Sequence, residues 1–303
     1  MINVTLKQLR YFEALAQHGH FGQAANACAI SQPALSVQIR DLELELGQPL
    51  VERGARQVRL TAFGENVLQR ASAILRQTEE LGDFSRSASG SMMDRLRLGI
   101  IPTIAPYLLP RLIGNLAAEF PGLEVSVRET VTPRLIEELH ASRIDAALVA
   151  LPVSEPGLTE MPLFDESFVL VRHQSEANRP VPDGEALAQM RLLLLEEGHC
   201  FRDAALSFCQ IGSAMPRDGL DGSSLTTLVQ MVGVGLGVTL IPEMAVAVET
   251  QSAPVAVTRF EAPQPSRSIG FVWRKASPLA EQFARIADVA KEVGLAQQET
   301  AAL

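Results

Sequence analysis

The spacing of apolar residues changes once along the chain, near residue 90, and this change limits the fold more than any other feature. Before it, apolar side chains recur every three or four residues, as on one face of a helix. After it, short apolar runs of strand length alternate with helical stretches. The 303 residues are therefore expected to form a mainly helical head and an α/β body.

The head is predicted to contain three short helices. Apolar residues mark one helical face from Leu6 to Leu15, and a second helix follows the break at Gly19-His20. The third helix begins at Ser31, a favoured N-cap residue, and ends at Gly47. Its inward stripe consists of Leu35, Ile39, Leu42 and Leu46.

Two short helices joined by a tight turn are typical of a helix-turn-helix, whose second helix enters the major groove of DNA. The segment from Val51 to Leu60, with a turn at Gly54-Ala55, is expected to form a winged hairpin whose arginines lie along phosphate. A plain three-helix bundle is the alternative. The residues expected to contact DNA are Ser31, Gln32, Pro33, Ser36, Val37, Arg40, Arg53 and Arg56.

Charge is distributed unevenly between the head and the body. The whole chain has a net charge of −9, whereas residues 1–62 contain six cations and five acids. The surplus of negative charge therefore lies entirely after residue 62. A head that is close to neutral can meet phosphate through a local patch, which Arg53, Arg56 and Arg59 supply.

A long helix without proline is predicted from Phe63 to Phe84. Its apolar or small positions recur at the spacing of a heptad seam, which would pair two chains over about 33 Å. The alternative is a helix that packs on its own domain. A hinge is expected from Ser85 to Met93. The seam positions are Val67, Ala71, Ile74, Thr78 and Leu81.

The body is predicted to contain right-handed βαβ units, a parallel sheet and two α/β lobes with a cleft between them. Gly233, Gly235 and Gly237 follow a helix and precede a strand, so they indicate tight packing at a turn and not a nucleotide-binding loop. Strands are expected near residues 96–100, 125–127, 146–150, 168–171, 192–195, 239–241 and 269–273. Helices are expected near 107–120, 134–142, 203–208, 224–231 and 279–293.

Two of the three cysteines in the chain are close neighbours in the body. Cys200 lies beside His199 and Arg202, cations that would stabilise a thiolate, and Cys209 follows nine positions later, near enough to form a disulfide. The alternative is that both thiols are small buried apolar groups. Cys28 is isolated in the head and is expected to be a core residue.

A series of positions in the head has the spacing of one DNA-binding module: Phe21, Ala24-Ala25, residues 31–36, Gln38-Ile39, Leu42-Glu43, residues 45–47, Arg53, Arg56 and Leu60-Thr61. This series resembles the winged helix-turn-helix of LysR-type transcriptional regulators. Such regulators continue with a linker helix and a two-lobed α/β domain similar to periplasmic binding proteins, so the resemblance covers essentially the full length. The chain departs from the family at Val51, usually Phe, and at Phe63, where Ala is common.

The resemblance implies three parts. Residues 1–62 would be the winged helix-turn-helix, residues 63–90 the dimerisation helix with its hinge, and residues 91–303 a redox-sensing regulatory domain. Within the last part, lobe I would comprise about 91–163 and 269–303, and lobe II about 164–268.

Further motifs in the body resemble those members of the family that sense hydrogen peroxide: residues 101–103, 107–110, 162–166, 197–200, 202–203, 208–209 and 269–270. The resemblance implies that Cys200 is the peroxidatic thiol and that Cys209 resolves it as a disulfide. Thr103, Thr132, His199 and Arg267 would hold peroxide, with Arg202 and Asp203 completing the network. If residues 201–209 are helical when reduced, the thiols lie about 13 Å apart along the helix axis, so closing a disulfide requires a rearrangement.

Thr103 and Thr132 each stand between an expected strand and an expected helix. This places both at the carboxyl edge of the sheet, where open α/β folds bind ligands. Each hydroxyl could also cap the helix that follows it, a role compatible with holding peroxide.

The resemblance also implies the partners. These are promoter DNA in double-stranded form, RNA polymerase, hydrogen peroxide, three further copies of the chain in a dimer of dimers, and glutaredoxin or thioredoxin as reductant. The chain would mainly activate antioxidant genes, would be no enzyme and would need no cofactor or metal. The Met1–Lys7 segment shows no secretion signal and the apolar runs are short, so a cytoplasmic location without a membrane is expected.

Three alternatives stay open. A regulator of the same family could bind a small organic effector in the cleft between the lobes, with the cysteines incidental. A thiol peroxidase would leave the DNA-binding head unexplained. A thiolate metal sensor would lack a fourth ligand, and the spacing of His199, Cys200 and Cys209 fits no common zinc pattern.

Overall fold

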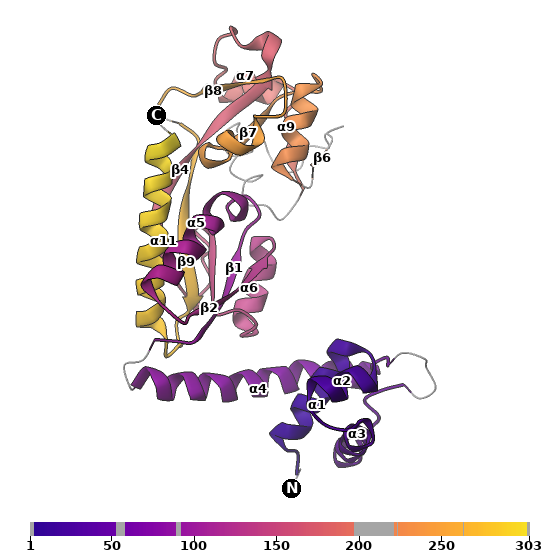
Figure 1. Ribbon diagram of the computed structural model, residues 1–303. Helices are drawn as coiled ribbons and strands as arrows, with labels where there is room; N and C mark the ends of the chain where they lie inside the picture. Colours follow the sequence, from indigo (N-terminus) through magenta and orange to yellow (C-terminus); the bar gives the residue numbers. More distant parts are fainter. Residues whose placement is uncertain are drawn as a thin grey trace. The chain divides into compact units, whose positions relative to one another are not determined.

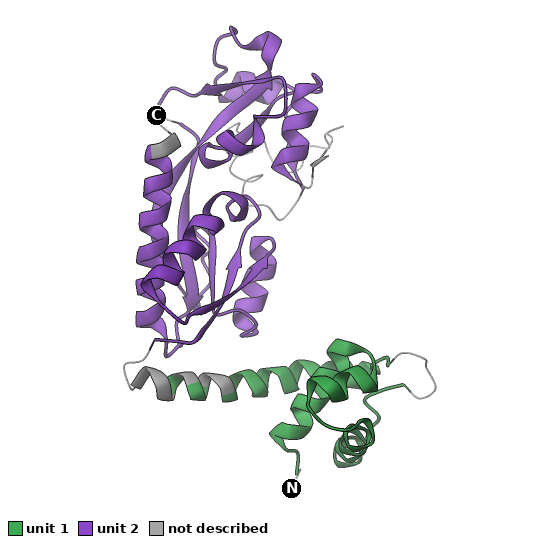
Figure 2. Cartoon of the chain, viewed as in Figure 1, with its two compact units in different colours: residues 1–88 green, residues 89–303 purple. Residues whose placement is uncertain are grey.

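The structure, a computed structural model, describes residues 3–52, 58–88, 92–196, 221–222, 224–262 and 264–301. Its internal contacts divide the chain into two compact units, residues 1–88 and 89–303, drawn in green and purple in Figure 2. The first unit is helical and ends with the long helix α4 (Ala62–Ala88), and the second combines helices with a sheet (Figure 1).

The three predicted helices of the head are confirmed. They are α1 (Leu6–His18), α2 (Phe21–Ala27) and α3 (Gln32–Leu46). Ser31 caps α3 as expected, since its hydroxyl accepts a hydrogen bond from Ala34 N–H at 3.3 Å. Gly47 ends the helix with φ of 74°, in the left-handed region that glycine adopts without strain. The core of the unit is made by Phe12, Leu15, Leu35, Ile39 and Leu42, which are almost completely buried.

The strands of the predicted wing pair as expected. Val51 and Leu60 form an antiparallel bridge, and Glu52 N–H donates to Arg59 O at 2.9 Å. The predicted turn at Gly54-Ala55 lies outside the described residues. Val51 and Phe63, the two departures from the family pattern, both pack against the core of the head, so their apolar character is used there.

The long helix α4 extends through Ala88, so the prediction that a hinge begins at Ser85 is wrong. The first part of α4 packs on α1 and buries Ala71 and Leu75 in the core of the head. Ile74, which lies between them, is 44% exposed, and Leu81 further along is 68% exposed. One face of the first part of α4 therefore packs on its own unit, whereas two apolar positions of the predicted seam are exposed.

The sheet of the second unit has the order β2-β1-β3-β9-β4-β7, with β8 also paired to β4. The strand β1 (Arg95–Ile100) is parallel to β2 (Glu124–Glu129) and to β3 (Ala146–Leu151), as the predicted βαβ units require. The prediction of a parallel sheet fails beyond β3. There β9 (Ser266–Arg274) returns from the distant part of the chain and runs antiparallel to β3.

The strand β4 (Leu158–His173) joins two parts of this unit. Its first ten residues pair antiparallel with β9, and its last residues pair antiparallel with β7 (Thr239–Pro242) and β8 (Val255–Arg259). In Figure 1, β4 extends from the region of β1 and β2 to the region of β7 and β8. Residues near the middle of β4 therefore lie where the two lobes meet.

Helices cover this sheet. After β1 comes α5 (Ala105–Glu119), and after β2 comes α6 (Thr132–His140). The last helix, α11 (Ala280–Ala301), packs on α5 and β4 and is longer than predicted. The remaining elements are η1 (Gln174–Glu176), α7 (Gly184–Gln189), β5 (Leu194–Leu195), β6 (Asp221–Gly222), α9 (Leu225–Gly233), η2 (Glu243–Ala245) and α10 (Val246–Glu249). The helix predicted at 203–208 lies outside the described residues.

The glycines between α9 and β7 form a tightly packed turn, as predicted. Gly235 has φ of 79°, and a Cβ on Gly237 would lie 2.3 Å from the carbonyl oxygen of Arg191. A Cβ on Gly233 would meet Pro254 at 3.0 Å. These contacts explain why glycine is required at these positions, so no bound nucleotide is needed to account for them.

Candidate functional site

Two predicted site residues lie just after the ends of neighbouring strands, at the same edge of the sheet. Thr103 follows β1 and Thr132 follows β2, and the register pairs Ile100 of β1 with Glu129 of β2. Because both strands are parallel, their carboxyl ends meet at one edge, where open α/β sheets bind ligands. The prediction that both threonines lie at this edge is therefore confirmed.

Neither threonine hydroxyl caps the helix that follows it. The N-cap of α5 is Ile104 and that of α6 is Val131, and neither cap makes a side-chain hydrogen bond. Thr132 is instead the first residue of α6. The capping role that the sequence left open is therefore wrong, and both hydroxyls are available for other contacts.

Arg267, at the start of β9, meets Thr103 at this edge. Its Nη1 donates to Thr103 Oγ1 at 2.7 Å, and its Nη2 donates to the Thr103 carbonyl at 3.0 Å. Both residues are buried, with 6% and 2% of their surface exposed. Two of the four residues predicted to hold peroxide are thus in direct contact, although they are 164 positions apart in the sequence.

These groups retain hydrogen-bonding capacity. The Thr103 oxygen accepts from Arg267, and within the described ranges its own O–H has no acceptor, so it can donate elsewhere. Among the described residues, four of the five guanidinium N–H groups of Arg267 have partners, which leaves one on Nη1. The hydroxyl of Thr132 is buried and has no partner in the described part of the chain. Unused donors at a buried sheet edge can bind a small polar molecule.

The other edge of the Arg267 guanidinium is held by Glu166. The register of β4 and β9 pairs these two residues directly, and Glu166 Oε2 accepts from Nε at 2.8 Å and from Nη2 at 2.7 Å. Met244 N–H donates to Oε1 of the same carboxylate at 3.3 Å. Burial raises the pKa of Glu166, and the adjacent Arg267 opposes this change.

Sequence reasoning did not single out Glu166 as a site residue. It belongs to the motif at residues 162–166, but the strand was predicted to start only at Phe168. A signal was present, because an acid within an apolar strand needs a buried partner.

A second polar contact joins the two lobes near this edge. The hydroxyl of Tyr107, on α5, donates to Glu249 Oε1 on α10 at 2.7 Å. Both residues are buried, and burial together with the hydrogen bond to this carboxylate raises the pKa of Tyr107 far above its usual range.

The remaining predicted residues of the body site are not placed. Cys200, Cys209, His199, Arg202 and Asp203 all lie outside the described residues. The third thiol, Cys28, is partly buried against the core of the head, as predicted, and burial raises its pKa. No group of three or more His, Cys, Asp or Glu side chains within the described ranges could hold a metal ion. None of the helices described there is long and apolar enough to cross a bilayer.

The outward face of α3 is mostly open to solvent. Of the residues predicted to contact DNA, five are exposed and Ser36 is half-buried. The other two, Arg53 and Arg56, lie outside the described residues. The exposed residues are Ser31, Gln32, Pro33, Val37 and Arg40.

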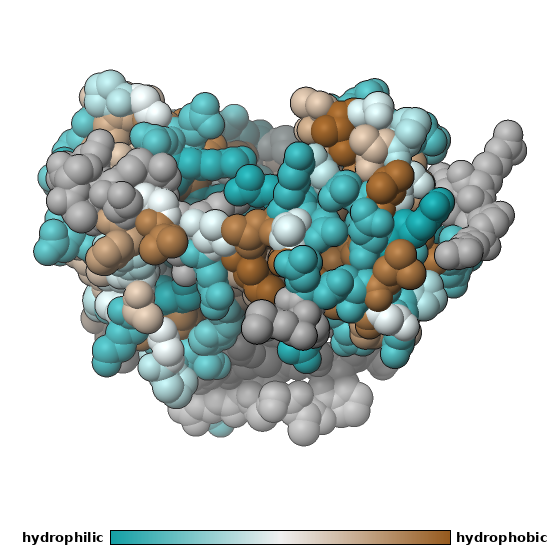
Figure 3. Space-filling model, turned by 90° about the horizontal axis from the view of Figure 1, so that it is seen from below, coloured by the Kyte–Doolittle hydropathy of each residue, from teal (hydrophilic) through white to brown (hydrophobic). Residues whose placement is uncertain are grey.

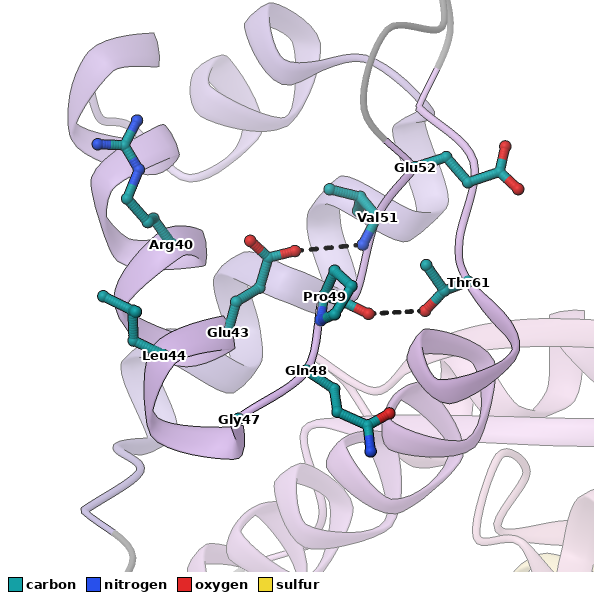
Figure 4. A pocket seen from close by; sticks show the side chains of 9 residues that line it. All are labelled: Arg40, Glu43, Leu44, Gly47, Gln48, Pro49, Val51, Glu52 and Thr61. Atoms are coloured by element: carbon teal, nitrogen blue, oxygen red, sulfur yellow. Dashed lines mark hydrogen bonds between the residues drawn. The ribbon is translucent and has the colours of Figure 1, made fainter.

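A groove of about 460 Å³ lies between the end of α3 and the start of the wing (Figure 4). Glu43 Oε1 accepts hydrogen bonds from Leu50 N–H at 2.8 Å and from Val51 N–H at 3.3 Å. Thr61 Oγ1 donates to the Pro49 carbonyl at 2.8 Å. These bonds fix the connection between the predicted recognition helix and the wing.

On the face shown in Figure 3, hydrophobic residues form separate groups among hydrophilic ones.

Two family models match this chain. The model for the bacterial regulatory helix-turn-helix protein of the lysR family matches residues 6–65, and the LysR substrate binding domain matches residues 89–294. Together they cover both units of the structure. The chain therefore belongs to the LysR family of bacterial transcriptional regulators.

Within this family, the chain is similar to regulators named for hydrogen peroxide. It is 41% identical over 293 residues to a probable hydrogen peroxide-inducible genes activator of Streptomyces viridosporus, covering 95% of this chain and 94% of the relative. It is 38% identical to the DNA-binding transcriptional dual regulator OxyR of Escherichia coli K12, covering 94% of each chain.

Two solved structures of OxyR proteins are also similar to this chain. A full-length OxyR variant from Pseudomonas aeruginosa matches with a TM-score of 0.74 and 35% identity, over 95% of each chain. A variant of Corynebacterium glutamicum OxyR with hydrogen peroxide bound matches with a TM-score of 0.69 and 37% identity, over 99% of this chain and 95% of that chain. The predicted resemblance to the peroxide-sensing members of the family is confirmed.

Proposed function

We propose that this chain is a LysR-type transcriptional regulator that senses hydrogen peroxide and is switched by a reversible disulfide between Cys200 and Cys209. The observation that carries the proposal is the buried contact between Arg267 and Thr103, with unused donors at the carboxyl edge of the sheet. The similarity to regulators named for peroxide supports it.

The chemistry needs a thiolate and donors for a leaving oxygen. The Cys200 thiolate attacks one oxygen of peroxide, the O–O bond breaks, and hydroxide leaves and takes a proton to become water. Arg267 and Thr103 donate to the oxygen on which negative charge develops, together with Thr132 and His199. The product is a sulfenic acid on Cys200.

The second step forms the disulfide. The Cys209 thiolate attacks the sulfur of the sulfenic acid, and the oxygen leaves as hydroxide and is protonated to water. A dithiol protein such as glutaredoxin or thioredoxin returns both thiols and becomes oxidised itself. Arg202 and Asp203, which follow Cys200 by two and three positions, would complete the network around it.

Disulfide formation would change DNA binding through the geometry of the assembly. Two heads on paired α4 helices, in a dimer of dimers, would contact promoter DNA through the exposed face of α3 and through Arg53 and Arg56. Residues 1–62 would form the DNA-binding domain, 63–90 the linker and 91–303 the sensing domain. The oxidised form would act with RNA polymerase, in the cytoplasm, mainly to activate antioxidant genes.

A small organic effector is less compatible with the site. Effectors with a carboxylate need a free cation, and the guanidinium of Arg267 already faces the Glu166 carboxylate of the chain itself. Hydrogen peroxide is uncharged and needs only the remaining donors. This pairing favours a small neutral oxidant over an effector with a carboxylate.

Intact-mass measurement with peptide mapping tests the proposal. After stoichiometric peroxide, the reduced chain should lose two hydrogen atoms and yield one cross-linked peptide containing Cys200 and Cys209. Cys200→Ser should abolish this product and the transcriptional response while leaving DNA binding intact, and Cys28→Ser serves as the matched control. If both thiols of the wild type stay free after peroxide treatment, the proposed function is wrong.

A further inference from the structure

The carboxylate of Glu166 lies directly opposite Arg267 on the neighbouring strand. Their positions are paired in the antiparallel register of β4 and β9, so both side chains extend from the same face of the sheet. The side chains are 1% and 3% exposed. A buried guanidinium without a counter-charge would be strongly unfavourable, so the pair with Glu166 stabilises Arg267 inside the protein.

The contact also selects which part of the guanidinium faces the site. Glu166 takes the Nε and Nη2 edge, and Nη1 is left to donate to Thr103 Oγ1. Because the guanidinium is planar and its N–H groups form a rigid fork, fixing one edge fixes the direction of the remaining N–H on Nη1. The remaining N–H on Nη1 of Arg267 therefore points in one direction, which Glu166 on β4 fixes.

The carboxylate is itself held in place. Met244 N–H, in η2, donates to Glu166 Oε1 at 3.3 Å, and Phe168, two positions along β4, lies under the guanidinium with 5.8 Å between its ring centroid and Arg267 Cζ. Glu166 is thus connected to lobe II through η2 and to the sheet edge through Arg267. Among the described residues, its contacts include neither threonine of the site.

We infer that Glu166 is a positioning residue of the peroxide site, which acts through Arg267 and does not itself touch the oxidant. It orients Arg267 Nη1 beside the Thr103 hydroxyl, so that two donors converge on the oxygen that leaves. It also balances the charge of Arg267, so that the donor acts on charge developing during the reaction and does not attract a permanent anion. This inference rests on the proposed function.

The test compares two reactions of the same thiol in the full-length reduced protein. Reaction of Cys200 with hydrogen peroxide depends on the donors, whereas alkylation by iodoacetamide depends only on the thiolate and its access. Glu166→Gln should slow the peroxide reaction about 10- to 100-fold, because misplaced catalytic groups lose rates of this order. It should leave alkylation within about twofold of the wild type, since the thiolate itself is unchanged.

A matched control exists in the same unit. Arg97 and Asp145 form a second bidentate pair, with Arg97 Nη2 2.6 Å from Asp145 Oδ1, and no described contact joins it to Thr103 or Arg267. Asp145→Asn should leave both rates unchanged.

Sulfate or chloride should inhibit the peroxide reaction of the Glu166→Gln variant more than that of the wild type, because the positive charge of the Arg267 guanidinium is no longer balanced by a carboxylate.

Several outcomes would overturn the inference. One is a Glu166→Gln protein that reacts with peroxide as fast as the wild type, and another is an equal loss of peroxide and alkylation rates, which indicates general disruption. If Glu166→Gln does not fold, Glu166→Asp keeps the charge and shortens the reach, and an unchanged peroxide rate in that variant would refute the positioning role. A wild-type Cys200 that reacts with peroxide no faster than free cysteine would instead refute the proposed function.

Discussion

Two arginine-carboxylate pairs in the second unit use the same chemistry at different ends of the strands. Arg97 and Asp145 join β1 to the residue just before β3. Arg267 and Glu166 join β9 to β4, beside the edge where β1 ends. The side chain of Arg97 is 23% exposed, whereas that of Arg267 is 3% exposed.

The difference shows that location and unused donors, and not the ion pair itself, define the site. Arg97 holds two strands together at the end where they begin, in partial contact with water. Arg267 lies at the carboxyl edge, where its charge acts through a less polar medium and where its remaining N–H and the Thr103 O–H have no partner among the described residues. We therefore expect the second arrangement, and not the first, to stabilise charge on a small oxygen species.

Replacing each arginine in turn should give the largest difference in peroxide rate and in stability. Arg267→Met should slow the reaction of Cys200 with peroxide about 10³-fold, the upper range for loss of a donor to developing negative charge. It should also lower the free energy of unfolding by about 3–5 kcal/mol, because Glu166 is left buried without its cation. Stopped-flow thiol oxidation and urea denaturation measure the two effects.

Arg97→Met is the matched variant at the other end of the strands. It should cost about 1.5–3 kcal/mol of stability, the value of hydrogen bonds to a charged group. The peroxide rate should stay at the wild-type value. Equal losses of rate in the two variants would contradict the distinction between the pairs.

Variants of the two threonines should separate an effect on the peroxide rate from an effect on stability at the carboxyl edge. Thr103→Val and Thr132→Val should each slow the peroxide reaction about 10²-fold, since each removes one donor. Their effects on stability should differ. Thr103→Val leaves Arg267 Nη1 without its acceptor and should cost about 1–3 kcal/mol.

Thr132→Val should not lower the free energy of unfolding and should raise it by about 1–3 kcal/mol, because the buried hydroxyl has no partner to lose among the described residues. A variant with intact stability and a slow peroxide reaction would mark Thr132 as a residue of the site and not of the fold. Full peroxide reactivity in Thr132→Val would remove it from the site.

Much of this arrangement could be predicted from the sequence because it depends on local patterns. Ser31 and Gly47 set the ends of α3 through capping, and the strand-helix alternation placed Thr103 and Thr132 at one edge. The contact between Thr103 and Arg267 was implied only by the family resemblance. No local pattern relates residues separated by most of the body.

Other features depend on long-range pairing and could not be predicted. The antiparallel direction of β9 results from its return beside β3 after the whole second lobe, which periodicity does not encode. Glu166 has a role only because β4 and β9 are in register at that position. The continuation of α4 past Ser85 was missed because small and polar residues there were interpreted as a hinge.

The smallest effect concerns the contact between the lobes, where a hydrogen bond to a buried carboxylate distinguishes Tyr107 from the other, equally buried tyrosine of the chain. The chain has two tyrosines, and Tyr107 is bound to Glu249 while Tyr11 lies in the head. An unfolded tyrosine loses its proton near pH 10, but burial and the carboxylate raise the pKa of folded Tyr107 well above that value. Above about pH 10 the folded state therefore binds more protons than the unfolded state, and stability falls as the pH rises, by at most about 1.4 kcal/mol per pH unit from this group. Tyr107→Phe should flatten this fall between pH 10 and pH 11 in urea denaturation under reducing conditions. An unchanged slope in Tyr107→Phe would mean that the hydroxyl does not stay protonated between the lobes.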